Sequence, residues 1–380
     1  MSLSVNQSPE TFTPSYNDVN YVVSESSGAV YSSSNFKFIA EVVVDASTIA
    51  KLKVPIYFGS TNKGVFNIGR LLESYTTHDF KYSDTAASGC TNSFKDYSVK
   101  FGEEYSASAT GTVTEYLNLT SASGTVWNAA LNPITFVSFD SDTYAANNSS
   151  RKFLTSVRSQ TIHRTQKVWL YALRGAATNL RILYSDSTTA TITLPSTKMV
   201  RVPINLSTPA GATYFDCYLR DVDGVTVSET YRFTIKDECS KYDTYDLFFL
   251  NRLGGFDSFR FNRVSKSSYD ITRKTFRQNQ YTLDNTAVSW TYGTDSFSNV
   301  QYYEESKQKL TLFSNWITDT ESIWLRELVE SPVVYLWDGT TLQAVNITNS
   351  MYEEKKWIND KMFNLQLDIE FSFVDKKQRR

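Results

Sequence analysis

The sequence predicts an all-β, or β-dominated, protein with two to three antiparallel β-sandwich or barrel domains and a few short helices. Aromatic residues make up 14% of the 380-residue chain, beside abundant Ser, Thr and Val, which suit a pleated, half-buried surface. Short apolar alternations recur and end at Gly, Pro, Asp or Ser, as they do in a sandwich or barrel. Helical patterns are too scarce for parallel crossovers, so the sheets are expected to be antiparallel.

Residues 1–20 predict an extended N-terminal arm. They contain Pro9, Pro14 and mostly small polar side chains, with neither strand nor helix periodicity. An unpaired segment of this kind can become ordered by adding a strand to a neighbour's exposed sheet edge. We therefore expect the arm to take part in assembly.

A β-sandwich domain is expected over residues 21–140. Apolar residues recur at even spacing in 36–44, and a second run in 49–58 follows after a turn, which predicts a hairpin or meander. Ile68, Leu71, Leu72 and Tyr75 fall at i, i+3, i+4 and i+7 and predict a short helix. Further strand patterns are found at 97–101, 112–119 and 134–139.

A second β-sandwich domain is expected over residues 150–238, because the polar stretch 140–150 suits a boundary. Several short alternating runs follow, and Asp223 with Gly224 lies between two of them, which predicts a tight hairpin turn. The same residues could open a calcium loop. That interpretation is disfavoured, because a further Asp or Asn and a terminal Glu are missing from the required register.

A β-rich C-terminal domain is expected over residues 239–380. It contains one clear helix near 319–330, for which Thr318 and Glu321 form a capping box. A second hairpin turn is predicted at Asp338 and Gly339. The strict alternation of residues 363–373 is the clearest strand pattern in the chain.

The paired glycines Gly254 and Gly255 lie between aromatic clusters in FFLNRLGGFDSFRF. A phosphate-binding loop would need further glycines at fixed spacing, or a lysine after the second glycine. Neither is present, so we expect a turn that lets Phe248 and Phe249 meet aromatic residues of 256–261.

We predict no catalytic, cofactor-binding or metal-binding residue, no cofactor and no enzymatic activity. The histidines His78 and His163 lie far apart, with no nucleophile motif beside them, and are expected on the surface or in turns. The three cysteines occur in no close pair, which disfavours a disulfide framework or a zinc site. They are expected as buried side chains or free thiols, at positions Cys90, Cys217 and Cys239.

Neighbouring carboxylates keep a glycosidase hypothesis open, since paired acids can hydrolyse glycosides. The pairs are Glu103 with Glu104, Asp243 with Asp246, and Glu353 with Glu354. Adjacent strand residues face opposite ways, so we interpret the first pair as a solvated turn after Gly102. The tryptophans are scattered, and packing explains them better than a sugar-stacking platform. They are Trp127, Trp169, Trp290, Trp316, Trp324, Trp337 and Trp357.

The formal net charge of -2 gives no general attraction to nucleic acid or anionic lipid. The basic residues Lys376, Lys377, Arg379 and Arg380 are interpreted as a solvated tail. No signal peptide is expected, and the apolar runs are too short to span a membrane.

Three stretches together resemble a group of virion structural proteins of tailed bacteriophages, especially phages of Bacteroidetes and marine bacteria. They are NFKFIAEVVVDASTIAKLKVP followed by GVFNIGRLLESY, then YDLFFLNRLGGFDSFRF, and SIWLRELVESPVVYL with YEEKKWINDKMFNLQLDIEFS. The resemblance covers most of the chain and rests on packing and turn patterns. It implies a tail, tail-hub, ring or baseplate component, made in the host bacterial cytoplasm and located in the virion.

The expected function is therefore assembly in multiple copies. Sister copies would form a ring-like homo-oligomer through heterologous contacts, beside other tail or neck proteins. No direct nucleic-acid binding and no membrane insertion are expected. The alternative is a tail adhesin that binds a host surface glycan, which the Tyr-rich composition also suits.

Overall fold

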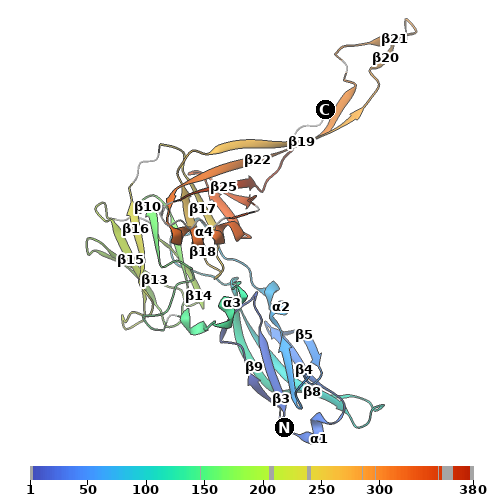
Figure 1. The fold of residues 1–380 in the computed structure, drawn as a ribbon, viewed down its shortest axis with the longest axis vertical. Coiled ribbons are helices and arrows are strands. Elements are labelled where there is room, and N and C mark those ends of the chain that lie inside the picture. Colours follow the sequence, from blue (N-terminus) through green and yellow to red (C-terminus); the bar gives the residue numbers. More distant parts are fainter. Residues whose placement is uncertain are drawn as a thin grey trace. The chain divides into compact units, whose positions relative to one another are not determined.

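The computed structural model describes residues 3–145, 147–204, 209–237, 241–284, 286–295, 297–349, 351–352 and 363–376. Within these residues strands predominate, and the helices are few and short (Figure 1). The all-β, multi-domain sandwich fold is therefore confirmed. The chain forms two compact units, of which the first comprises residues 1–237 with 250–258 and the second comprises 238–249 with 259–380.

The first sandwich in unit 1 consists of a three-stranded sheet, β1-β3-β6, and a five-stranded sheet, β2-β9-β8-β4-β5. Alternate side chains from both sheets form one core, in which Phe101 lies 5.4 Å from Tyr21 and 5.9 Å from Phe66, between ring centroids. The strands are β1 (Leu3–Gln7), β2 (Phe12–Pro14), β3 (Asn20–Glu25), β4 (Ser34–Val44), β5 (Ser47–Val54), β6 (Lys63–Asn67), β8 (Phe94–Ser106) and β9 (Thr114–Trp127).

The predicted N-terminal arm is wrong, because this segment pairs within its own chain. β1 pairs antiparallel with β3, and β2 pairs parallel with β9. Leu3 is buried in the core although the residues around it are mostly polar. The strands at 3–7 and 12–14 therefore already have sheet partners and are not free strands for a neighbour.

Short helices connect the strands of this region. The predicted hairpin of β4 and β5 is confirmed, and the helix predicted at 68–75 is divided into α2 and η1. The strand predicted at 134–139 is wrong, since α3 lies there. Asn132 caps α3 by accepting a hydrogen bond from the Thr135 amide, and Pro133 suits its first turn. The helices are α1 (Gly28–Tyr31), α2 (Gly69–Leu72), η1 (Glu73–Tyr75), α3 (Pro133–Val137) and η2 (Ser141–Thr143).

The second sandwich in unit 1 has sheets β10-β16-β15-β12-β13 and β11-β14-β7. All pairs in these sheets are antiparallel except β10 with β16, which is parallel. The predicted turn at Asp223 and Gly224 is present, with φ of +80° at the glycine; Asp221 accepts two amide hydrogen bonds there. The strands are β7 (Ser88–Gly89), β10 (Ser159–His163), β11 (Val168–Leu173), β12 (Asn179–Tyr184), β13 (Thr189–Thr193), β14 (Met199–Ile204), β15 (Tyr214–Arg220) and β16 (Tyr231–Lys236).

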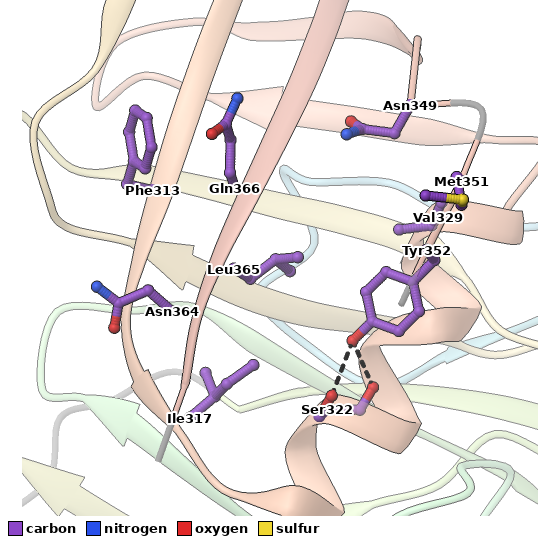
Figure 2. Close-up of a pocket in the computed structure, with 10 residues that line it drawn as sticks. All are labelled: Phe313, Ile317, Ser322, Val329, Asn349, Met351, Tyr352, Asn364, Leu365 and Gln366. Atoms are coloured by element: carbon purple, nitrogen blue, oxygen red, sulfur yellow. Dashed lines mark hydrogen bonds between the residues drawn. The ribbon is translucent and has the colours of Figure 1, made fainter. Parts of the chain in front are cut away.

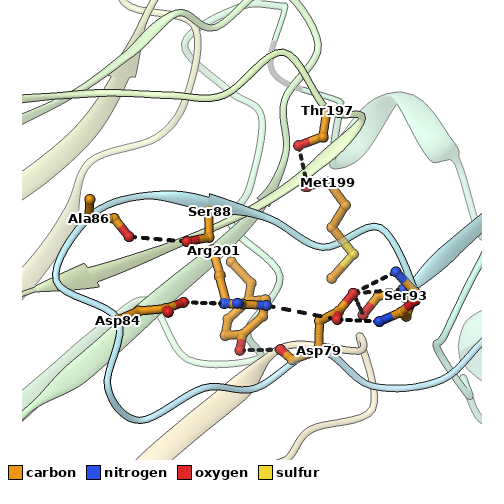
Figure 3. A network of polar contacts seen from close by, with 10 residues as sticks. Asp79, Asp84, Ala86, Ser88, Ser93, Thr197, Met199 and Arg201 are labelled. Atoms are coloured by element: carbon orange, nitrogen blue, oxygen red, sulfur yellow. Dashed lines mark hydrogen bonds and ion pairs between the residues drawn. The ribbon is translucent and has the colours of Figure 1, made fainter.

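A buried polar network joins the two sandwiches (Figure 3). Arg201 on β14 pairs with Asp84 at 2.8 Å and lies 3.9 Å from Asp79. Asp79 in turn accepts a hydrogen bond from the Ser93 amide. Residues 79–93 and β14, on either side of the stretch 140–150, therefore belong to the same compact unit.

The paired glycines make the expected turn, between β17 (Tyr245–Leu250) and β18 (Phe256–Phe261). Asn251 donates its amide to the carbonyl of Gly255, and Gly254 has φ of +83°. This turn belongs to unit 1, where the buried Trp127 indole donates to the carbonyl of Leu253. Close packing explains the glycine at position 254, since an added Cβ would lie 2.1 Å from the Asn128 carbonyl oxygen.

Unit 2 contains an eight-stranded sheet in the order β18-β17-β23-β24-β25-β22-β19, with β26 paired to β22. The hairpin predicted at Asp338 and Gly339 joins β23 to β24. A two-stranded sheet, β20 with β21, lies between β19 and β22 in the chain. The further strands are β19 (Lys266–Arg277), β20 (Tyr281–Asp284), β21 (Ser289–Tyr292), β22 (Asn299–Ile317), β23 (Val334–Trp337), β24 (Leu342–Ile347), β25 (Phe363–Phe371) and β26 (Asp375–Lys376).

The predicted helix is confirmed as α4 (Asp319–Glu330), with the capping box of Thr318 and Glu321. Trp324 of α4 packs against Phe249 and Phe259, so the helix covers the β17–β18 part of the sheet. Among the described residues, no helix combines the length and the apolar character needed to cross a membrane.

Candidate functional site

The most distinctive surface of unit 2 is a β-ribbon, defined here as the described residues of 266–306. It comprises β19, the β20–β21 hairpin and the first part of β22, and Figure 1 shows it running beyond the other strands of its sheet. β25 pairs with β22 only from Lys309 onward, and β26 pairs at Glu305 and Ser306. Within the described chain, residues 299–304 of β22 therefore pair with β19 alone.

The two long strands are held together by their ladder and by cross-strand side-chain pairs. Arg273 lies 3.3 Å from Glu304, and Phe276 and Tyr302 have ring centroids 6.1 Å apart. Such pairs fix the register of an antiparallel ribbon but contribute only about 0.2–1 kcal/mol each. The ribbon therefore has a defined geometry with little stabilisation of its own.

The ribbon exposes an unusual amount of apolar surface. All twelve residues of β19 are exposed, and no face of that strand is covered. Trp290 in the β20–β21 hairpin is 68% exposed and Val288 is 82% exposed. The large exposed apolar side chains are Tyr269, Ile271, Phe276, Tyr281, Leu283, Val288, Trp290, Phe297 and Tyr302. An isolated two-stranded ribbon is marginally stable in water, and exposed apolar patches mark interaction sites. The ribbon is therefore the candidate interaction surface of unit 2.

Sequence reasoning did not identify this surface, although a signal was present. The segment KSSYDITRKTFR, residues 266–277, has strand-forming residues but no continuous apolar face. A strand that lacks an apolar face cannot join a core, which indicates a solvated ribbon. The length of the ribbon depends on pairing between distant segments and has no local signature.

The two histidines lie in separate environments. His78 is half-buried, with its ring centroid 5.7 Å from that of Phe256, and burial lowers its pKa although Asp79 opposes the shift. His163 ends β10, and its amide donates to the Gln166 side chain. The surface or turn placement expected for His78 is therefore only partly correct.

The cysteine prediction is confirmed for the two cysteines that the structure describes. Cys90 and Cys217 are buried free thiols. Burial raises the pKa of Cys90 to about 12 and that of Cys217 well above its ordinary value. Both are therefore poor nucleophiles at neutral pH. Cys239 lies outside the described residues.

The carboxyl groups of Glu103 and Glu104 do not converge on one site. The interpretation of Glu103 and Glu104 as a solvated turn is wrong, because both are buried in β8. They face opposite ways: Glu104 pairs with Lys53 at 2.5 Å, whereas Glu103 faces Glu25 of β3. Burial first, and then the Glu25 carboxyl, raises the pKa of Glu103 to about 7.

The remaining acidic candidates are structural or lie outside the described chain. Asp246 is buried and forms a two-point ion pair with Arg260, at 2.6 and 2.7 Å. Asp243 is exposed, and Glu353 and Glu354 lie outside the described residues. Among the described residues, no group of three or more His, Cys, Asp and Glu side chains is placed to hold a metal ion. Of the basic tail, Lys376 is exposed in β26 and the rest is not described.

The tryptophans divide between core and surface. Trp127, Trp169 and Trp324 are buried, as packing predicts, whereas Trp290 and Trp316 are exposed. Two sets of aromatic side chains therefore remain open in unit 2, one on the ribbon and one around Trp316. Trp337 is half-buried, and Trp357 lies outside the described residues.

Comparison with known proteins identifies no family. No family model matches the chain, and no curated protein matches it. Among solved structures, extracellular domains 3–5 of Drosophila OTK align with 83% of this chain and 93% of theirs, at 8% identity and a TM-score of 0.23. A 1.5-MDa bacterial ice-binding adhesin aligns with 82% of this chain and 92% of its own, at 7% identity and a TM-score of 0.20. Scores this low carry no argument about function.

Proposed function

We propose that this protein is a structural component of a tailed-bacteriophage particle, which assembles in multiple copies in the tail, tail hub, ring or baseplate. The observation that supports assembly most directly is the exposed ribbon of unit 2. The assignment to a phage particle rests on the resemblance of the sequence to tailed-phage virion proteins. The partners are sister copies, together with other tail or neck proteins.

The ribbon suits contact with a second copy of this chain because its charges are complementary to each other. Beside the Arg273–Glu304 pair within the ribbon, β19 carries the cations Lys274 and Arg277, and β22 carries the acid Glu305. One copy can thus present a basic strand to the acidic strand of the next. Contacts between different surfaces of identical chains form a ring when the rotation from one copy to the next closes.

Burial of the ribbon provides the driving force for assembly. Fully burying one large apolar side chain is worth about 1.5–3 kcal/mol, and nine such side chains are exposed on the ribbon. Covering even part of them offsets the entropy lost when two chains associate, which is about 4–15 kcal/mol. The N-terminal segment, which the sequence suggested for this role, already has partners within the chain.

The test compares the full chain with a double variant, Phe276→Ser with Trp290→Ser, by sedimentation velocity and negative-stain electron microscopy. We expect the unsubstituted protein to form oligomers at micromolar concentration and the double variant to shift toward monomer. The matched control is Val222→Ser with Val225→Ser, which removes exposed apolar side chains from a turn of unit 1. Monomeric unsubstituted protein, or equal assembly of all three proteins, would refute the role of the ribbon.

The virion location has its own test. Antibody labelling and mass spectrometry of purified particles from a phage that encodes this chain should place it in the tail or neck. Its absence from mature particles would reject the proposed particle component, whatever the oligomeric state of the purified protein.

A further inference from the structure

A groove in unit 2, separate from the apolar side chains of the ribbon, is formed by two adjoining hollows of about 410 and 560 Å³. Both are lined by Phe313 of β22 and Asn364 of β25, so they meet at these side chains. Figure 2 shows the first hollow between the β22–β25 strands and α4, with Tyr352 on its far side. Volumes of this size are typical of small-ligand sites.

A β-bulge opens the second hollow. The register of β22 against β25 shifts between Phe313, which lies opposite Gln366, and Trp316, which lies opposite Asn364. The buried Ser314 hydroxyl accepts a hydrogen bond from the Leu365 amide and so fixes the bulge. Bulges redirect side chains, and here Trp316 lines the hollow while 55% of its surface is exposed.

Amide side chains line the first hollow beside the aromatic rings. They belong to Asn349, Asn364 and Gln366. The Asn349 carbonyl oxygen accepts a hydrogen bond from the Asp368 amide at 2.6 Å, so its amide nitrogen is oriented as a donor. The Tyr352 hydroxyl donates to the Ser322 carbonyl at 2.6 Å and thereby anchors the wall of the hollow to α4.

Among the described residues, Arg263 and Lys266 line the second hollow, and their side chains contact neutral groups. Arg263 donates to the Asn315 side chain at 2.6 Å, and the Lys266 ammonium lies 5.8 Å from the centroid of the Phe313 ring. The described residues that line the two hollows include neither Asp nor Glu. The groove therefore has a positive end that would attract a carboxylate.

We infer that this groove binds an acidic saccharide. The exposed indole of Trp316 and the Phe313 ring offer apolar faces for sugar rings, and the amides can pair with hydroxyl groups. Arg263 and Lys266 would bind the carboxylate of a uronic acid residue. The planar guanidinium of Arg263 can donate two parallel hydrogen bonds to such a carboxylate. This inference does not depend on the proposed role in assembly.

The experiment is isothermal titration calorimetry of the full chain with tetragalacturonate, and with maltotetraose as the neutral probe of equal length. A tetrasaccharide cannot bridge several copies, so its affinity does not depend on oligomeric state. We expect saturable binding of tetragalacturonate and at least tenfold weaker binding of maltotetraose. Trp316→Ala and Lys266→Ala should each weaken binding of the acidic probe about tenfold, as truncated contact residues do.

The matched control is Trp290→Ala, which removes another exposed indole, on the ribbon, and should bind like the unsubstituted protein. Thermal melting verifies that each variant is folded. If Trp316→Ala does not fold, Lys266→Ala alone tests the inference. Failure to bind tetragalacturonate at millimolar concentration would overturn the inference. So would equal binding of the neutral probe, or an unchanged affinity in both groove variants.

Discussion

The buried carboxyl pair of the first sandwich makes the stability of unit 1 depend on pH. Glu103 on β8 and Glu25 on β3 come from opposite sheets, and both are buried, with exposed fractions of 7% and 1%. The Ser27 amide donates to Glu25 at 2.7 Å, whereas one oxygen of Glu103 is buried without a hydrogen-bond partner. Glu103→Gln is therefore the informative substitution, because it replaces a carboxyl with a neutral group of the same shape.

The direction of the pKa shift determines whether the free energy of unfolding rises or falls with pH. Burial, and then the charge of Glu25, raises the pKa of Glu103 from 4.5 to about 7. Between these values the folded chain holds a proton that the unfolded chain has released, so stability falls as the pH rises. The contribution is fully present below about pH 4.5 and is lost by about pH 7. The full difference between the folded and unfolded pKa values of Glu103 corresponds to about 3 kcal/mol of unfolding free energy. Solvent screening reduces the expected loss to about 2 kcal/mol.

Urea denaturation between pH 4.5 and 8, followed through unit 1, measures this loss. We expect the difference in unfolding free energy between Glu103→Gln and the unsubstituted protein to grow with pH, to about 2 kcal/mol in favour of the variant at pH 8. Glu115→Gln is the control: this exposed neighbour has its pKa lowered by Lys53 and Lys51, so its contribution is constant over the range. A difference that does not change with pH, or a less stable Glu103→Gln at pH 8, would refute the reasoning.

Three further predictions concern local packing. Gly254→Ala should destabilise the protein by about 2–4 kcal/mol, because the residue has positive φ and its Cβ would clash with Asn128. The control is Gly339→Ala, which has positive φ but open space around it and should cost only about 1 kcal/mol in the same urea denaturation assay. Thr318→Ala should cost about 1 kcal/mol through loss of the capping box, and Thr318→Ser should retain most of it; equal melting of both variants would contradict this. Cys90 should react with iodoacetamide only after unfolding, since burial raises its pKa to about 12, and rapid labelling of the native chain would show otherwise.

Local patterns were sufficient wherever a single periodicity or cap determined the outcome. The alternation of residues 363–373 and the capping box at Thr318 each predicted an element that the structure contains. The segment 134–139 shows the limit of this reasoning. Its apolar residues suit a strand, but the cap formed by Asn132 and Pro133 determines the structure.

Errors arose where pairing between distant segments decided the result. Glu103 and Glu104 follow Gly102 and have the composition of a turn, yet β8 continues through them because β4 and β9 supply its hydrogen bonds. The N-terminal segment lacks a pattern of its own and becomes strands because β3 and β9 offer edges to it. The local sequence does not indicate which sheet edge will be free to pair with this segment.

The candidate surfaces were less predictable than the fold for the same reason. Trp316 and Trp324 lie eight positions apart, but a bulge exposes the first and packing of α4 buries the second. The groove around Trp316 also needs Arg263, which lies 53 positions away and reaches it only through the pairing of β19 with β22. Sequence reasoning therefore predicted that aromatic residues would pack, but not which of them would stay open.

The long strand β22 connects the two proposed functional surfaces and also separates them. Its first half forms the ribbon, and its last residues form the bulge at Phe313 to Trp316. A second irregularity, in the ladder of β19 and β22, lies between Lys274 and Thr275. A one-residue change of register turns every side chain of a strand to the other face. Because each bulge adds an unpaired residue, the ribbon end and the groove end of β22 can pair in independent registers. Replacing residues 276–300 with an Asn-Gly turn should therefore abolish assembly while leaving tetragalacturonate binding within about twofold of its original affinity. Loss of both properties in a folded variant would show that the ribbon and the groove form one surface.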